Sequence, residues 1–166
     1  ELLLETRHPL SIVTKGSALL RDLDLLAELA THGLVSVFVS ITSLDNTLSS
    51  KLEPRAAAPH TRLKMIAALR DAGVPTGVLV APVIPMITDM HLEHILEAAR
   101  DAGAQSAGYV LLRLPHELKE IWRECSRTFT ARIRTWCRRS RVFNGTSFRS
   151  SPRSGFATAE FPKRSA

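Results

Sequence analysis

The chain has 166 residues, the length of one ordinary domain, and 45% of them are hydrophobic, which is enough for a core. No run approaches the roughly 20 apolar residues of a membrane-spanning helix, and no signal peptide opens the chain, so we expect a cytoplasmic protein without a membrane partner. Residues 125–166 hold ten Lys and Arg and one acid, Glu160, whereas residues 1–124 hold 12 Lys and Arg and 15 acids. This asymmetry predicts a domain over residues 1–124 and a basic tail over residues 125–166.

The domain begins with a strand-like pattern followed by a helix-like one. Residues 10–14, LSIVT, predict a short buried strand, and residues 15–21 predict a loop. Asp22 is a good N-cap for a helix that runs to about His32 and ends at Gly33.

The second strand is predicted over residues 35–41, VSVFVSI, and a connection over residues 42–59 follows it. This connection is longer than the typical two to six residues of such loops, which favours function or mobility. The next helix is predicted over residues 61–72, with Gly73 closing it.

Residues 73–89, GVPTGVLVAPVIPMITD, contain the third predicted strand. Residues 78–83 are apolar without polar alternation, which is typical of a strand buried on both faces of a parallel sheet. Ligands bind such sheets at the C-terminal ends of the strands, here residues 81–89. Pro82 and Pro85 remove two backbone donors there and leave carbonyl groups turned toward a ligand. A stiff loop without a ligand is the alternative.

The last part of the domain repeats the pattern. Thr88 or Asp89 is expected to cap a helix that ends at Gly103, residues 106–112 predict a fourth strand, and residues 115–122 predict a helix that starts at a proline. Because helices separate the strands, the strands should be parallel. The predicted fold class is therefore α/β, with about four parallel strands in a small open sheet or a partial (βα) barrel, followed by the basic tail.

Candidate binding residues occur at the end of each predicted strand. Lys15 follows the first strand, Ser40 and Ala81 lie at the ends of the second and third, and Arg113 follows the fourth. Because parallel strands end at one edge of a sheet, these groups and Arg55 of the long connection suit an anionic small ligand such as a carboxylate or phosphate. The simpler interpretations are a solvated lysine, a serine bonded to backbone and an arginine paired with a nearby acid.

Other chemistries are disfavoured. Asp45 and Asp89 are better interpreted as caps or turn residues than as catalytic acids. His91 and His94 have no third metal ligand near them in the sequence. No glycine-rich phosphate loop, dinucleotide fingerprint or Ser-His-Asp order occurs. We therefore predict no metal site from these residues.

Four segments around the strand ends form an ordered set: VTKG, VSVFVSITSLD, LEPRAAAPHTRLKMIAALRDAGVPTGVLVAPVIPMITD and YVLLRLPHEL. From about Arg7 to Glu120, the chain resembles the radical S-adenosylmethionine superfamily, and within it the branch of spore photoproduct lyase and its relatives, often labelled DNA repair photolyases. The resemblance implies a partial (βα) barrel that holds a 4Fe-4S cluster and S-adenosylmethionine. It also implies reductive cleavage of S-adenosylmethionine to a 5′-deoxyadenosyl radical, which abstracts hydrogen from a substrate.

The resemblance also implies roles for the strand-end residues. Lys15 and Ser40 resemble contacts for the methionyl and ribose ends of the cofactor, and Ala81 resembles the backbone contact to its adenine. Arg55 and Arg113 are weaker correspondences, placed at the site without a fixed role.

One part of the family pattern is missing. The family holds its cluster with a C-x₃-C-x₂-C motif after the first barrel strand, because thiolates are the iron ligands. No such motif occurs here, and Cys125 and Cys137 lie in a region that does not match. The chain therefore resembles the second half of a radical enzyme, and we expect such a fragment to be inactive alone.

The basic tail has three interpretations. Its ten cations with interleaved aromatic residues suit nucleic acid, which makes a non-enzymatic nucleic-acid-binding module the alternative function. The same composition is typical of a disordered tail. An abrupt change to Arg, Ser and Thr is also what a shifted reading frame produces. We expect disorder or a shifted frame.

Overall fold

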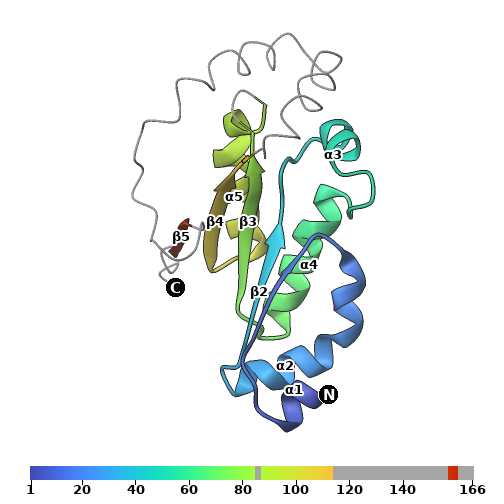
Figure 1. Cartoon of the computed structure of the whole chain (residues 1–166), viewed down its shortest axis with the longest axis vertical. Coiled ribbons are helices and arrows are strands. Elements are labelled where there is room, and N and C mark those ends of the chain that lie inside the picture. Colours follow the sequence, from blue (N-terminus) through green and yellow to red (C-terminus); the bar gives the residue numbers. More distant parts are fainter. Residues whose placement is uncertain (85–86, 114–156, 161–166) are drawn as a thin grey trace.

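A computed structural model describes residues 1–84, 87–113 and 157–160 of the chain (Figure 1). Strands and helices alternate along it, as the sequence predicts for an α/β protein. In chain order the elements are α1 (Leu2–Glu5), β1 (Leu10–Thr14), η1 (Ser17–Asp22), α2 (Leu23–Thr31), β2 (Val35–Ser40), α3 (Asn46–Leu52), α4 (Pro59–Asp71), β3 (Thr76–Val83), η2 (Asp89–His91), α5 (Leu92–Ala102), β4 (Ser106–Leu111) and β5 (Ala157–Glu160). No helix within these residues is long and apolar enough to cross a membrane.

The strands form one sheet in the order β1-β2-β3-β4-β5. Strands β1 to β4 are parallel neighbours, each paired with the next along the chain. Sequential order is the arrangement of a (βα) barrel, whereas a doubly wound sheet reverses its order at a switch point. The α/β fold with four parallel strands in a partial (βα) barrel is therefore confirmed.

The fifth strand comes from the basic tail. β5 pairs antiparallel with β4, with Ser106 opposite Glu160 and Tyr109 opposite Ala157. These four tail residues are ordered as a strand, which the sequence did not predict. The helix predicted over residues 115–122 and the rest of the tail lie outside the described residues, so their predictions stay predictions.

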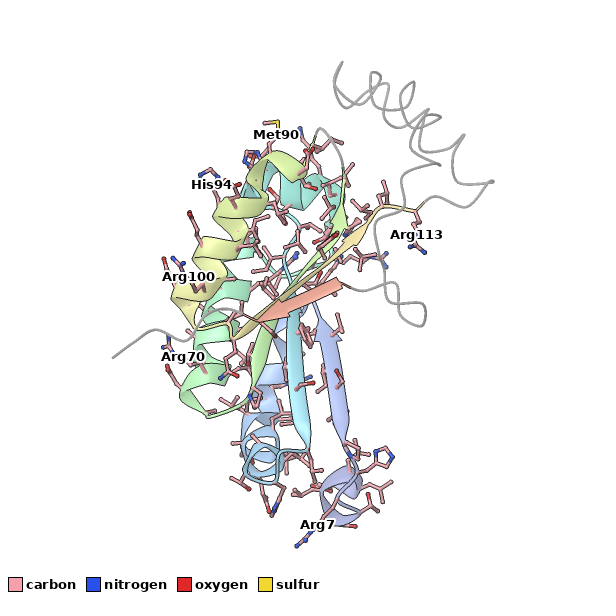
Figure 2. The ribbon with its side chains drawn as sticks, turned by 90° about the vertical axis from the view of Figure 1, so that its left-hand side faces the viewer. Arg7, Arg70, Met90, His94, Arg100 and Arg113 are labelled. Atoms are coloured by element: carbon pink, nitrogen blue, oxygen red, sulfur yellow. The ribbon has the colours of Figure 1, made fainter. Side chains whose placement is uncertain are left out.

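The helices α2, α4 and α5 pack on one side of the sheet (Figure 2). The core between the layers is apolar, and Val37 and Val39 of β2 are 0% exposed against Ile66 of α4. Because side chains alternate along a strand, Ser36 and Phe38 point to the opposite side. We call the helix-covered side the outer face of the sheet and the opposite side its inner face.

The third strand is buried along most of its length, as its continuous apolar run predicts. On its inner face, Gly77 lies beneath the ring of Phe38 and beside the hydroxyl of Ser106. A Cβ atom at Gly77 would lie 2.5 Å from each of these side chains. The glycine therefore lets neighbouring strands pack over the middle of β3.

Two helical segments that lie within predicted loops account for most differences between the predicted and observed elements. The predicted loop over residues 15–21 contains η1, and the long connection over residues 42–59 contains a helix of its own, α3. The side chain of Asp45 caps α3, accepting hydrogen bonds from the backbone N–H groups of Thr47 (2.7 Å) and Leu48 (3.4 Å). Asp45 is thus a cap, as predicted.

The start of α5 was predicted wrongly. Neither Thr88 nor Asp89 caps this helix, because the short η2 turn precedes it and the N-cap position belongs to His91. The hydroxyl of buried Thr88 instead accepts a 2.8 Å hydrogen bond from the backbone N–H of Ile84. Thr88 therefore closes the turn that follows β3.

Candidate functional site

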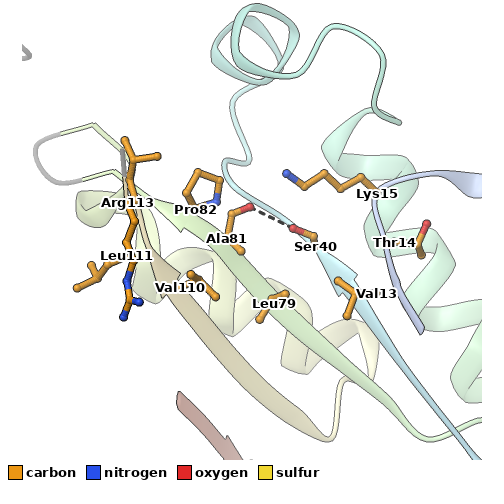
Figure 3. A pocket seen from close by; sticks show the side chains of 11 residues that line it. Val13, Thr14, Lys15, Ser40, Leu79, Ala81, Pro82, Val110, Leu111 and Arg113 are labelled. Atoms are coloured by element: carbon orange, nitrogen blue, oxygen red, sulfur yellow. Dashed lines mark hydrogen bonds between the residues drawn. The ribbon is translucent and has the colours of Figure 1, made fainter. Parts of the chain in front are cut away.

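A pocket of about 640 Å³ opens at the C-terminal ends of the four parallel strands (Figure 3). Its apolar lining includes Val13 of β1, Leu79 of β3 and Val110 of β4. Its charged groups come from Lys15 at one end and Arg113 at the other. Its volume falls in the range of about 300–1,000 Å³ that is typical of small-molecule sites. We call it the strand-end pocket.

Ser40 and Ala81 line the middle of the strand-end pocket, at the ends of neighbouring strands. Ser40 is 1% exposed, and its hydroxyl donates a 3.2 Å hydrogen bond to the carbonyl oxygen of Ala81 (Figure 3). This bond uses the only proton of the hydroxyl, so Ser40 offers a ligand its lone pairs alone. The Ala81 carbonyl has a second lone pair and can still accept one further hydrogen bond.

Lys15 follows β1 and forms an ion pair with Glu53, whose Oε1 lies 2.5 Å from its ammonium nitrogen. The other carboxylate oxygen of Glu53 accepts a 2.7 Å hydrogen bond from Arg62 of α4. The Arg62 side chain is 0% exposed. Charged side chains are almost never fully buried unless they are paired, and here the partner is Glu53.

The charge state of Glu53 follows from these contacts. Burial of the carboxyl by itself raises its pKa, but the hydrogen bonds and positive charges of Lys15 and Arg62 outweigh burial. The pKa of Glu53 therefore lies below its ordinary value, and at neutral pH the carboxylate is ionised. The three side chains together carry one net positive charge at this side of the pocket.

The two predicted arginines lie in different places. Arg113 is exposed and lines the strand-end pocket at the end of β4. Arg55 is exposed and lines a separate pocket of about 360 Å³, which it shares with Lys15 and Glu53. The structure thus brings Lys15, Ser40, Ala81 and Arg113 together and places Arg55 beyond Lys15, outside the strand-end pocket.

The described residues contain no group of three His, Cys, Asp or Glu side chains that could hold a metal ion. His94, on the outer helix α5, is exposed and lies on the opposite side of the view from Arg113 (Figure 2). Cys125 and Cys137 lie outside the described residues. The donor set that the structure does describe fits a small anion-bearing ligand and does not fit an iron-sulfur cluster.

Glu53 and Arg62 were not predicted as site residues, although the sequence holds a signal for one of them. Arg62 precedes Met65, Ile66 and Leu69 by three, four and seven positions, so it belongs to the buried face of α4. A charge at such a position needs a buried partner. The sequence does not say that the partner is Glu53, because that contact depends on how the α3–α4 connection folds back.

Comparisons with known proteins identify the family of this chain. A sequence model of the radical SAM superfamily matches residues 1–99. The chain belongs to the radical SAM superfamily. Members of this superfamily generally use S-adenosylmethionine and a 4Fe-4S cluster. The matched part contains β1 to β3 and the helices that join them, and therefore most of the strand-end pocket.

Relatives of this radical SAM chain occur in distant organisms. It is 46% identical over 98 residues to the uncharacterized protein Rv2578c of Mycobacterium tuberculosis, which covers 58% of this chain and 29% of the relative. It is 36% identical over 74 residues to the uncharacterized protein ORF301 of Acidianus two-tailed virus, a match that covers 45% of this chain and 24% of the relative. It is 26% identical over 87 residues to the uncharacterized protein MJ0683 of Methanocaldococcus jannaschii, a match that covers 52% of this chain and 32% of the relative. The chain thus spans under a third of these relatives. No solved structure matches it significantly.

Proposed function

We propose that this chain supplies the S-adenosylmethionine-binding strand ends of a radical enzyme similar to spore photoproduct lyase and its relatives. The observation that supports the proposal best is the strand-end pocket, in which a cation, a buried hydroxyl and a free carbonyl lone pair surround an apolar cavity. S-adenosylmethionine combines a carboxylate, sugar hydroxyls and a flat base, so each group has a complementary partner in this lining.

The proposed contacts follow the chemistry of each side chain. Lys15 binds the methionyl carboxylate through a charge-assisted hydrogen bond. Ser40 accepts a hydrogen bond from the ribose, and the Ala81 carbonyl accepts one from the adenine amino group. Arg113 offers a second cation at the far end of the pocket. Arg55 is assigned the weakest role, because it lies in the neighbouring pocket.

The chemistry that S-adenosylmethionine supplies in this superfamily is a 5′-deoxyadenosyl radical for hydrogen abstraction from a substrate. The chain contains no C-x₃-C-x₂-C motif. We therefore propose that the cluster ligands of a complete protein come from sequence outside this chain, and that the chain alone does not perform the reaction. Its own residues bind and orient the cofactor and keep water from the apolar wall.

The test is a titration of the purified chain with S-adenosylmethionine by isothermal calorimetry. Lys15→Ala should weaken binding about 10- to 100-fold, because a charged hydrogen bond contributes about 1.5–3 kcal/mol. Lys64→Ala is the control, a lysine of α4 that lines neither pocket. A chain that binds no S-adenosylmethionine, or a Lys15→Ala chain that binds it unchanged, would contradict the proposal.

Charge asymmetry favours a second candidate, a nucleic-acid-binding role for the basic tail. We propose that the basic side chains of residues 125–166 bind nucleic acid, because this region holds ten Lys and Arg with one acid. Its residues Ala157–Glu160 pair with β4 in the sheet. Binding to nucleic acid through phosphates weakens with added salt. Deleting residues 125–166 should abolish salt-dependent binding to single-stranded DNA, and unchanged binding after the deletion would remove this candidate.

A further inference from the structure

We infer that Glu53, anchored by Arg62, is a positioning residue that directs the Lys15 ammonium toward the ligand carboxylate in the strand-end pocket. The inference rests on the proposed function, because it assigns Lys15 the carboxylate contact. It adds that Glu53 and Arg62, which do not line the strand-end pocket, hold the Lys15 ammonium in position.

Arg62 is the buried and most tightly held member of this group of three side chains. Its guanidinium is 0% exposed and donates three hydrogen bonds, to the Ala57 carbonyl (2.7 Å), the Ser40 carbonyl (2.8 Å) and Glu53 Oε2 (2.7 Å). The planar guanidinium has its donors in a fixed fork, so three simultaneous bonds fix its orientation. Arg62 therefore holds the backbone of Ser40 and the carboxylate of Glu53 at once.

Glu53 divides its two oxygens between two cations. Oε2 faces the buried Arg62, and Oε1 lies 2.5 Å from the Lys15 nitrogen. The Lys15 side chain is 38% exposed and would otherwise sample many rotamers on its flexible stem. The ammonium has three N–H donors, and one faces Glu53, so two remain for a ligand. A rigid carboxylate thus restricts where a flexible cation can lie.

The backbone at Lys15 is also linked to Arg62, through hydrogen bonds of Ala57. The carbonyl of Lys15 accepts a 3.1 Å hydrogen bond from the N–H of Ala57, and the carbonyl of Ala57 accepts from Arg62. One guanidinium therefore connects the ends of β1 and β2 through the α3–α4 connection. Both proposed cofactor contacts at this side of the pocket, Lys15 and Ser40, depend on it.

A purely structural ion pair makes a different prediction from a positioning device. If Glu53 and Arg62 only stabilise the fold, weakening them should lower the affinity for all pocket ligands alike. If Glu53 orients Lys15, the loss should be confined to ligands that carry the carboxylate. S-adenosylmethionine and 5′-methylthioadenosine make this comparison, because the second lacks the amino-acid part and keeps the adenosine part.

The experiment measures both affinities by calorimetry in the wild-type chain and in Glu53→Asp. The shorter carboxylate stays paired with buried Arg62 and withdraws from Lys15, so S-adenosylmethionine should bind about 10-fold more weakly while 5′-methylthioadenosine changes less than about twofold. In a Lys15→Ala background the same substitution should cause no further loss. Asp71→Asn, which removes an exposed ion pair with Arg70, is the matched control.

A second variant covers the case in which Glu53→Asp does not fold. Glu53→Gln keeps the side-chain length, leaves one oxygen for Arg62 and removes the negative charge that holds Lys15. It should give the same selective loss, and thermal unfolding verifies that each variant is folded. Equal losses for both ligands, or none, would overturn the inference while leaving the proposed function in place. A wild-type chain that binds neither ligand would overturn both.

Discussion

The two faces of the sheet differ in how deeply their side chains are buried. On the outer face, the side chains of Val37, Val39 and Ile66 are 0% exposed beneath the helices. On the inner face at the strand ends, Val13 is 56% exposed and lines the strand-end pocket. The outer face supplies most of the burial that stabilises the fold, and the inner face leaves apolar area free for a ligand.

One group breaks this division. Arg62 is a charge in the buried layer, and its bonds lead to the edge where the pocket opens. We therefore expect stability and ligand binding to be coupled at the β1–β2 side, through Glu53 and Lys15. At the β3–β4 side no ion pair is found among the described residues of the pocket lining. The following predictions test the contrast between the faces and the exception to it.

The largest effect is expected from Arg62→Met. Removing one partner of a buried ion pair costs about 3–5 kcal/mol, because it leaves the other charge unpaired and here also leaves two backbone carbonyls without a donor. Urea unfolding should show this loss in free energy. Arg100→Met is the control, since the Arg100 side chain is 45% exposed beside Asp101 and should change stability by less than about 1 kcal/mol. Equal losses would refute the special role of the buried arginine.

Gly77→Ala should come second, at about 1–3 kcal/mol of lost stability, because the added methyl group overpacks the inner face. It would meet the ring of Phe38 and the hydroxyl of Ser106 at 2.5 Å. Gly16→Ala is the matched control, because a methyl group there would meet only the Thr14 hydroxyl, at 3.9 Å. If chemical denaturation gives the two variants equal losses of stability, close packing over β3 is not the reason why residue 77 is a glycine.

A smaller effect is expected from acid, because protonation leaves all packing in place. The pKa of Glu53 is lowered in the folded chain, so its ion pairs stabilise the chain at pH values above its ordinary value of 4.5. This stabilisation is lost as the pH falls below 4.5 through the folded-state pKa. Unfolding midpoints measured between pH 6 and pH 3 should therefore fall more steeply for the wild type than for Glu53→Gln. If the unfolding midpoints of the wild type and Glu53→Gln fall in parallel with pH, the lowered pKa of Glu53 does not contribute to stability.

The smallest effect is expected from Val13→Ser on the inner face. With 56% of Val13 exposed, the change in the free energy of unfolding should stay within about 0.5 kcal/mol. The matched outer-face variant, Val39→Ser, places a hydroxyl at a 0% exposed position and should lose at least about 2 kcal/mol. Similar losses at the two valines would erase the distinction between the faces.

Much of the fold was predictable because its signals are local. The boundaries of β1 to β4 agree with the predictions within two residues, since continuous apolar runs bounded by Gly and Pro specify buried strands. Gly33 also ends α2 as predicted, with φ of 67° and the hydrogen bonds from Gly33 N–H to Ala30 and from Leu34 N–H to Leu29 that close a helix. Helix α3 was missed, because its polar sequence has no apolar stripe of the expected width.

The sequence by itself determined the alternation of strands and helices, and with it the gathering of Lys15, Ser40, Ala81 and Arg113 at one edge, because parallel strands must end together. Only the tertiary structure decided that Arg55 lies in a second pocket and that Glu53 joins Lys15 to Arg62. The physical reason is the separation along the sequence over which each feature is determined. Strand order follows from patterns a few residues long, whereas an ion pair between residues 38 positions apart exists only after the chain has folded back on itself.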